Sequence, residues 1–182
     1  PSVVYGFFAF IYIGPLVVEF GEYAFANGWI DEAPNVLNPI NGAIVVGVMI
    51  LPLIASMSED ALRAVPNELR EGSLALGATK IETTMKVMIQ ASLSGIVASI
   101  ILALSRAVGE TMAVTLAVGT VAVYTSNMFL PAQTMTAYIA QRVGGDLPFG
   151  EIGYLTIFAV GLYLFVITLC LNLLGNKVLS AY

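Results

Sequence analysis

Long apolar blocks alternate with short polar connections along this chain. A helix needs about 20 apolar residues to cross the hydrocarbon core of a bilayer, which is about 30 Å thick. Four blocks fit this requirement: residues 3–20, residues 40–57, a block that begins near Val87 and stays uncharged to Ser105, and residues 152–174. The pattern predicts an all-α integral membrane protein with about four transmembrane helices.

The third block is too long for one simple crossing. Its apolar character returns at residues 112–123, after Arg106 and Glu110. A continuous helix over residues 87–123 would be about 55 Å long at a rise of 1.5 Å per residue. Two arrangements remain open: the first turns lie at the membrane interface, or the helix breaks near Gly109 and part of it re-enters the membrane.

Composition supports the membrane assignment. Of the 182 residues, 58% are hydrophobic and 10% are charged, and the mean hydropathy is +0.90. A soluble domain carries about 25% charged residues on average. The chain has no histidine and one cysteine, Cys170. It therefore lacks a disulfide framework, a histidine–cysteine metal cluster and a Ser/His or Cys/His nucleophile pair.

The basic residues predict the orientation. Four of the seven lysines and arginines lie between the second and third blocks, and Lys177 follows the fourth block. Residues 21–39 carry acids and no base. Because cytoplasmic loops are enriched in lysine and arginine, residues 58–86 and both termini are expected in the cytoplasm and residues 21–39 and 124–150 outside. The chain would then be a multi-pass protein of a cell inner membrane.

A short helix is expected in the outer connection. Pro131 precedes a run of good helix formers, residues 132–142, and Gly144 and Gly145 follow it. The favoured interpretation is a surface helix with no direct role in function.

The predicted cytoplasmic loop, residues 58–86, opens with a helix signal. Ser58 is a candidate N-cap, and Glu59 and Asp60 supply acids to the first turn, where the helix dipole favours them. Pro66 would close this helix.

Two further helices, separated by a glycine turn, are expected in the rest of the loop. Pro66 can start a short helix that reaches about Leu76, where Gly77 can end it in a left-handed conformation. Thr79 and Glu82 have the spacing of a capping box, so a third helix is expected to start after Thr79. A flexible linker would lack these signals.

Residues 72–79 also match the spacing of a phosphate-binding P-loop. Ala78 stands where the lysine that reaches the phosphates is required, and no strand precedes the segment. The chain is therefore not expected to bind ATP by this route.

The loop resembles the cytoplasmic signature of permeases from binding-protein-dependent ABC importers, Glu-Ala-Ala-x3-Gly-x9-Ile-x-Leu-Pro. Glu71, Gly77, Val87 and Ile89 match it in spacing, whereas Gly72, Ser73 and Gln90 depart from it. In that family the short helix docks into a cleft on the ATPase subunit. The resemblance implies that ATPase coupling involves Glu68, Arg70, Glu71, Gly77, Ala78 and Thr79. The alternative is a solvated inner loop without a partner.

Arg106 and Glu110 form the second candidate site. They are four residues apart, which places both on one face of a continuous helix. Lipid penalises charges, so this face should meet protein or a water-filled path. The arginine fork can donate two parallel hydrogen bonds to phosphate or carboxylate oxygens, and Glu110 could weaken its hold. The alternative is a salt bridge that only makes two membrane charges tolerable.

Small residues accompany this pair. The face shared with Arg106 and Glu110 continues through Ser99, Ala103, Ala113 and Ala117. A second row repeats a small residue every four positions at Ala91, Gly95, Ser99, Ala103 and Ala107. Such rows allow close contact between membrane helices.

The string Ser-Arg-Ala-Val-Gly-Glu-Thr-Met-Ala-Val at residues 105–114 resembles the C-type membrane subunits of the Pst family of phosphate importers. Residues 1–6 and 62–70 are similar to that family as well. The resemblance implies a substrate path that includes Ser99, Arg106, Glu110 and Thr111. Other oxyanions, namely molybdate, tungstate and sulfate, and an ion-coupled secondary carrier are alternatives.

The same resemblance implies the organisation of the transporter. Residues 1–182 would form a single permease domain whose first two spans, in a family with six, are missing before Pro1. The expected partners are a homologous A-type permease, an ATPase dimer, an extracytoplasmic phosphate-binding protein and the lipid membrane, with no nucleic acid. ATP and magnesium would bind the ATPase, and this chain would hold no cofactor or metal and would not be an enzyme.

Overall fold

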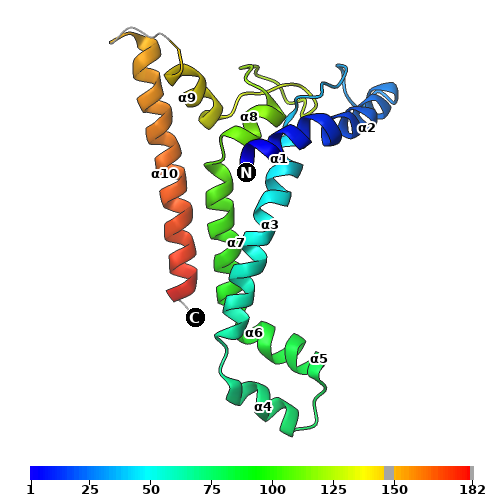
Figure 1. Ribbon diagram of the computed structural model, residues 1–182, viewed down its shortest axis with the longest axis vertical. Coiled ribbons are helices and arrows are strands. Elements are labelled where there is room, and N and C mark those ends of the chain that lie inside the picture. Colours follow the sequence, from blue (N-terminus) through cyan, green and yellow to red (C-terminus); the bar gives the residue numbers. More distant parts are fainter. Residues whose placement is uncertain (146–149, 181–182) are drawn as a thin grey trace. The chain divides into compact units, whose positions relative to one another are not determined.

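The computed structural model describes residues 1–145 and 150–180, and its regular elements are helices (Figure 1). One isolated β-bridge joins Thr120 to Gln133. The predicted all-α class is therefore confirmed for the described residues. Residues 146–149 of the predicted outer connection lie outside them.

Within the described residues, three helical segments are long and apolar enough to cross a membrane. They are Ser2–Ala26, α3 (Pro39–Arg63) and Ile152–Val178 of α10 (Ile152–Ser180). A bent pair, Lys80–Ala91 followed by α7 (Leu93–Val108), meets the same criteria together, with 65° between its two parts. With this pair as the fourth candidate span, the number agrees with the predicted one.

The first candidate span contains a π-helical turn. It consists of α1 (Ser2–Phe8), η1 (Ala9–Ile13) and α2 (Gly14–Ala26). Pro15 is the second residue of α2, separated from the π-helical residues only by Gly14. Proline donates no backbone hydrogen bond, and its ring clashes with the carbonyl group one turn earlier, so a wider turn before Pro15 accommodates it.

The third apolar block is bent at one point and broken at another. Ser92 separates α6 (Ile89–Ala91) from α7, and its Oγ donates a 2.9 Å hydrogen bond to the Met88 carbonyl, a bond that favours bending. After Val108 the chain leaves the helix and resumes in α8 (Met112–Val118). The structure therefore contains the break near Gly109 that the length of the block suggested.

The helix start predicted at Ser58 is wrong, because α3 continues through this residue to Arg63. Ser58 Oγ lies 3.0 Å from Ser99 Oγ on α7 and so bonds to another helix rather than to its own backbone. An ion pair of 2.6 Å between Arg63 and Glu59, one turn apart, further supports the continuous helix.

The residues form two compact units. In the first, residues 1–49 and 107–167, α1 packs against α8. Its buried cluster is made of small side chains: Ala9, Val45, Ala113 and Ala117. Small side chains allow the helix backbones to approach closely, which membrane helices use in place of large apolar cores.

In the second unit, residues 50–106 and 168–182, α3 and α7 make close contact. A Cβ atom added at Gly95 would lie 2.7 Å from the Ala61 Cβ. One turn further along, Ser99 is 1% exposed and meets Ser58. Two members of the predicted row of small residues thus permit a close helix contact, as expected.

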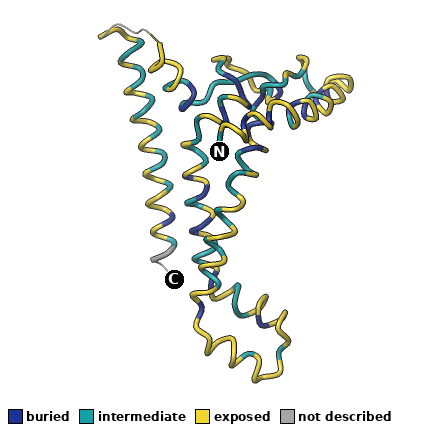
Figure 2. Tube along the Cα trace, in the orientation of Figure 1, coloured by how far each residue is buried: buried dark blue, intermediate teal, exposed yellow. Residues whose placement is uncertain are grey.

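The surfaces of the candidate spans are apolar. In the most apolar window of α10 no residue is buried, and Figure 2 shows this helix mostly as exposed or intermediate. Phe7, Phe20, Leu51 and Leu162 are between 58% and 65% exposed in the single chain. Soluble monomers rarely expose so much contiguous apolar surface, so these faces meet lipid or other membrane subunits.

A glycine pair tests the contact between α3 and α7. Gly95→Leu is expected to destabilise the protein by about 1–3 kcal/mol, because the new side chain would overlap Ala61. Thermal unfolding of the purified protein in detergent would measure the change. Gly47→Leu on α3 is the control, because no atom lies within 4 Å of a Cβ there. Equal stability of the two variants would contradict the close contact.

Candidate coupling loop and substrate path

The short helix of the loop, α4 (Asn67–Ala75), forms within one residue of its predicted bounds. Gly77 has φ of +87°, and its N–H donates to the Leu74 carbonyl at 3.0 Å. The Ala78 N–H donates to the Ser73 carbonyl at 3.2 Å. These two bonds form a Schellman motif, which satisfies the last carbonyls of the helix and reverses the chain. The predicted left-handed stop at Gly77 is confirmed.

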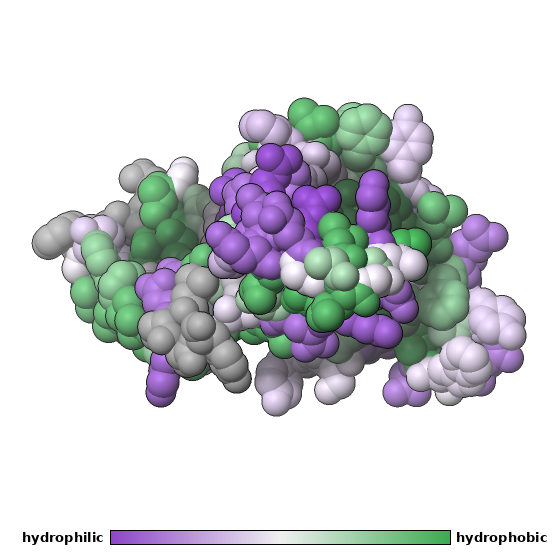
Figure 3. Space-filling view, turned by 90° about the horizontal axis from the view of Figure 1, so that it is seen from below, coloured by the Kyte–Doolittle hydropathy of each residue, from purple (hydrophilic) through white to green (hydrophobic). Residues whose placement is uncertain are grey.

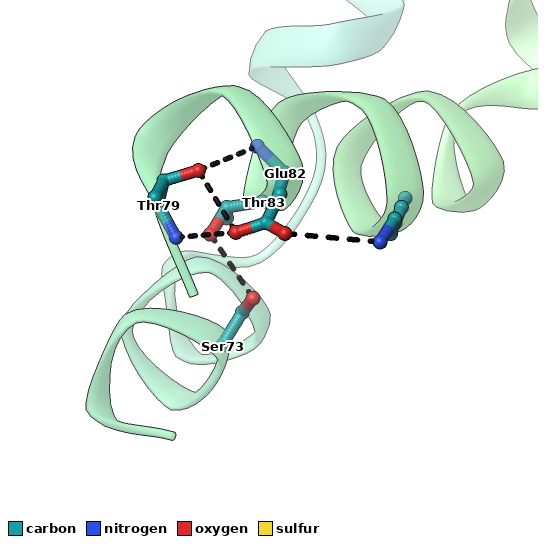
Figure 4. A network of polar contacts seen from close by, with 5 residues as sticks. Ser73, Thr79, Glu82 and Thr83 are labelled. Carbon is teal, nitrogen blue, oxygen red and sulfur yellow. Dashed lines mark hydrogen bonds and ion pairs between the residues drawn. The ribbon is translucent and has the colours of Figure 1, made fainter. Parts of the chain in front are cut away.

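A capping box starts the next helix, α5 (Lys80–Thr83), as predicted. The Glu82 N–H donates to Thr79 Oγ1 at 3.3 Å, and the Thr79 N–H donates to Glu82 Oε2 at 3.0 Å (Figure 4). The Thr79 hydroxyl also donates to this carboxylate, at 2.9 Å. These hydrogen bonds, the backbone one first, lower the pKa of the exposed Glu82 side chain, so the carboxylate stays charged at neutral pH.

One side-chain contact ties the two helices of the loop together. Ser73 Oγ on α4 lies 3.0 Å from Thr83 Oγ1 on α5, and Thr83 is 2% exposed (Figure 4). Ser73 replaces the second alanine of the importer signature, and here its hydroxyl supplies the bond. The departure from the signature therefore adds a hydrogen bond that alanine could not make. This bond joins the helices on the two sides of the turn, α4 and α5.

The loop exposes the charged residues that the resemblance assigned to coupling. Glu68, Arg70 and Glu71 are all exposed on α4. Leu76, at the turn, is 90% exposed, a position that the sequence reasoning did not single out. Figure 3, a view onto the end of the molecule where Figure 1 places α4, shows hydrophilic and hydrophobic side chains side by side. In the sequence, the signal for this exposed position was an apolar residue, Leu76, directly before the turn glycine Gly77.

The helical face predicted for Arg106 and Glu110 is wrong beyond Val108, where α7 ends. Arg106 lies in the last turn of α7 and is exposed in the single chain. Glu110 lies in the turn that follows, and its Oε1 accepts a hydrogen bond from the Ala113 N–H at 3.3 Å. Glycine at position 109 disfavours the helix, and a side chain that bonds to nearby backbone stabilises the break. The face that was predicted to continue through Ala113 and Ala117 therefore does not lie on one continuous helix.

The other two predicted path residues make local contacts. Ser99 Oγ donates to the Ile96 carbonyl at 2.7 Å and meets Ser58, so its hydroxyl takes part in helix packing. Thr111 precedes α8, and its Oγ1 donates to the Gly109 carbonyl at 3.4 Å. A role of Ser99 and Thr111 in a substrate path stays a prediction.

The helix that was predicted for the connection before the last apolar block contacts the turn at Glu110. This helix, α9 (Met135–Val143), starts later than predicted because Thr134 caps it by accepting from the Ala137 N–H at 3.2 Å. Thr136 Oγ1 donates to the Glu110 carbonyl at 2.8 Å. The helix is therefore joined to a predicted path residue. A contact between residues 26 positions apart leaves no local signal in the sequence.

The geometry defines a class of protein: a multi-pass α-helical membrane protein with a capped, hydrogen-bonded polar loop between two candidate spans. The chain belongs to the family of binding-protein-dependent transport system inner membrane components, whose family model matches residues 1–179. This family consists of membrane components of transport systems, which agrees with the prediction of a permease subunit that is not an enzyme.

Individual relatives agree with the family. A probable ABC transporter permease protein, YqgH of Bacillus subtilis, is 34% identical over 174 residues, which cover 96% of this chain and 53% of the relative. The phosphate transport system permease protein PstC of Mesorhizobium japonicum is 33% identical over 92% of this chain and 54% of its own length. The chain thus spans about half the length of these relatives. No solved structure matches it.

Proposed function

We propose that the chain belongs to the C-type permease subunit of an ATP-driven phosphate importer in a cell inner membrane. The observation that carries this proposal is the loop built around Gly77, with its Schellman turn and capping box at the spacing of the importer signature. Relatives named as phosphate permeases support the choice of substrate. Residues 1–182 would act as one permease domain beside a homologous A-type permease.

The loop would couple this domain to a dimer of ATPase subunits. Glu68, Arg70 and Glu71 would face the ATPase from α4, and the turn formed by Gly77, Ala78 and Thr79 would transmit its movement to α7. The predicted positive-inside orientation, with both termini cytoplasmic, would put the loop on the side where ATP is available. ATP and magnesium would bind the ATPase, and this chain would need no cofactor of its own.

The transported anion would meet Arg106 near the break between α7 and α8. An arginine offers a planar fork to an oxyanion, and a carboxylate in the adjoining turn opposes tight binding, which a transport site must avoid. Ser99 and Thr111 are the further candidate path residues. An extracytoplasmic phosphate-binding protein would deliver the anion, and alternating access would carry it inward.

Reconstitution tests this function directly. The complete permease would be inserted into liposomes with its ATPase subunits and presented with the binding protein and phosphate, molybdate or sulfate. We expect phosphate alone to stimulate ATP hydrolysis and to accumulate inside. Stimulation by molybdate or sulfate would identify another oxyanion importer, and uptake without the ATPase would identify a secondary carrier.

A further inference from the structure

A pocket of about 430 Å³ opens beside α9. One wall comes from Thr120, in the extended segment after α8, and from Gln133, to which a β-bridge joins it. The other wall comes from Tyr138, Gln141 and Arg142 on α9. All of these residues belong to the first compact unit, so the pocket is formed within one packed body.

The charge of the pocket differs from that of the surrounding unit. Arg142 is the only lysine or arginine in residues 1–49 and 107–167. Among the described residues that line the pocket there is no carboxylate, and no described carboxylate forms an ion pair with Arg142. Among the described lining residues, the single cation of this unit therefore faces polar, uncharged neighbours.

The neighbours hold the donors in place. The Arg142 guanidinium carbon lies 5.4 Å from the centre of the Tyr138 ring, a distance at which the ring face attracts the cation. Gln133 Nε2 donates to Gln141 Oε1 at 2.8 Å, which leaves the amide N–H groups of Gln141 free to donate to a ligand. The Tyr138 hydroxyl is engaged with Thr156 Oγ1 at 2.7 Å, which anchors α9 to the start of α10.

The helix that carries the pocket also reaches the predicted substrate path. Thr136, in the first turn of α9, donates to the Glu110 carbonyl at 2.8 Å. Arg142 follows six residues later, which corresponds to a rise of about 9 Å along the helix. One rigid element thus connects the pocket with the turn at Glu110.

We propose that this pocket is a weak binding site for free inorganic phosphate on the outer side of the permease, ahead of the path at Arg106 and Glu110. The outer location and the substrate rest on the proposed function. Arg142 supplies the charge, and the side chains of Gln141 and Thr120 supply neutral donors for the remaining oxygens. An open pocket with one cation suits an anion that must be released after capture.

The test uses the whole importer complex in a maltoside detergent, whose head groups carry no phosphate, with the nucleotide sites of the ATPase filled. The linewidth of the inorganic phosphate ³¹P resonance reports binding. We expect Arg142→Gln to reduce the broadening caused by the complex by about tenfold, as for loss of a charge-assisted contact. Arg142→Lys should retain most of it, and Gln141→Leu should reduce it in part. Lys177→Gln, which removes the same charge elsewhere, should leave it unchanged.

Three results would overturn the proposal. Unchanged broadening in Arg142→Gln, with the complex intact by gel filtration, would remove the pocket from phosphate binding. Loss of the broadening when phosphatidylglycerol is added, restored when the lipid is removed, would make the ligand a lipid head group. Finally, Arg142→Gln could leave the broadening unchanged but raise the concentration of binding protein that gives half-maximal ATPase stimulation. Arg142 would then pair with a carboxylate of that partner.

The proposed function can fail separately. If the unmodified complex neither imports phosphate nor hydrolyses ATP in response to it, the import function is refuted. Broadening that still depends on Arg142 would then support the pocket alone.

Discussion

Replacing Arg106 with glutamine is expected to lower phosphate uptake by the reconstituted importer about 100-fold, while the complex still assembles. Hydrogen bonds to charged groups contribute up to about 3 kcal/mol, and each 1.4 kcal/mol corresponds to a factor of ten. Arg106 lies in the last turn of α7, directly before the break, and its side chain is exposed in the single chain. Its removal should therefore affect the anion more than the fold. Uptake of labelled phosphate into liposomes, with assembly followed by gel filtration, measures both effects.

Two further variants separate charge from geometry at this position. Arg106→Lys keeps the charge but loses the planar fork, so uptake should fall by about tenfold, between the unmodified protein and Arg106→Gln. Arg63→Gln is the matched control, because it removes an arginine whose ion pair with Glu59 is exposed to solvent and therefore contributes little to stability. Normal uptake by Arg106→Gln would exclude Arg106 from the substrate path.

Gly77→Val is expected to uncouple ATP hydrolysis from transport. The φ of +87° at this position is strained for any L side chain, by about 1–2 kcal/mol, and more for a β-branched one. The substitution should break the Schellman turn, reorient α4 and lower the uptake per ATP hydrolysed by about tenfold. Parallel measurements of phosphate uptake and ATP hydrolysis by the same liposomes give this ratio.

Gly72→Ala on the same helix is the control for Gly77→Val. No atom lies within 4 Å of a Cβ at either glycine, and of the two only Gly77 has a positive φ. Gly72 lies in the interior of α4, where alanine should stabilise the helix by about 0.5–1 kcal/mol and leave coupling intact. If Gly77→Val couples as well as Gly72→Ala does, the turn has no role in coupling.

The features of the loop could be predicted because their causes are local. The capping box joins Thr79 to Glu82, and the Schellman bonds around Gly77 join residues at most five positions apart. The candidate spans were predictable for a related reason, since an apolar run of sufficient length must be screened from water wherever it packs. Neither inference needs a distant partner.

Predictions from residue spacing failed where a side-chain hydrogen bond competed with the expected one. Ser58 has the sequence context of an N-cap, but its hydroxyl meets Ser99, 41 residues away, and α3 continues. Arg106 and Glu110 have helical spacing, but the chain leaves the helix at Gly109 and the Glu110 carboxylate turns to Ala113. In both cases a side-chain hydrogen bond opposed the interpretation based on spacing alone.

The sequence by itself determined the all-α membrane class, the candidate spans, the capped loop and the resemblance to importer permeases. Each follows from hydrophobic run length or from hydrogen bonds between near neighbours. Only the tertiary structure decided where α7 ends, that α9 contacts the turn at Glu110, and that Thr120, Gln133 and Arg142 line one pocket. The last two are contacts between residues that are distant in the chain, so their partners are defined only when the helices pack.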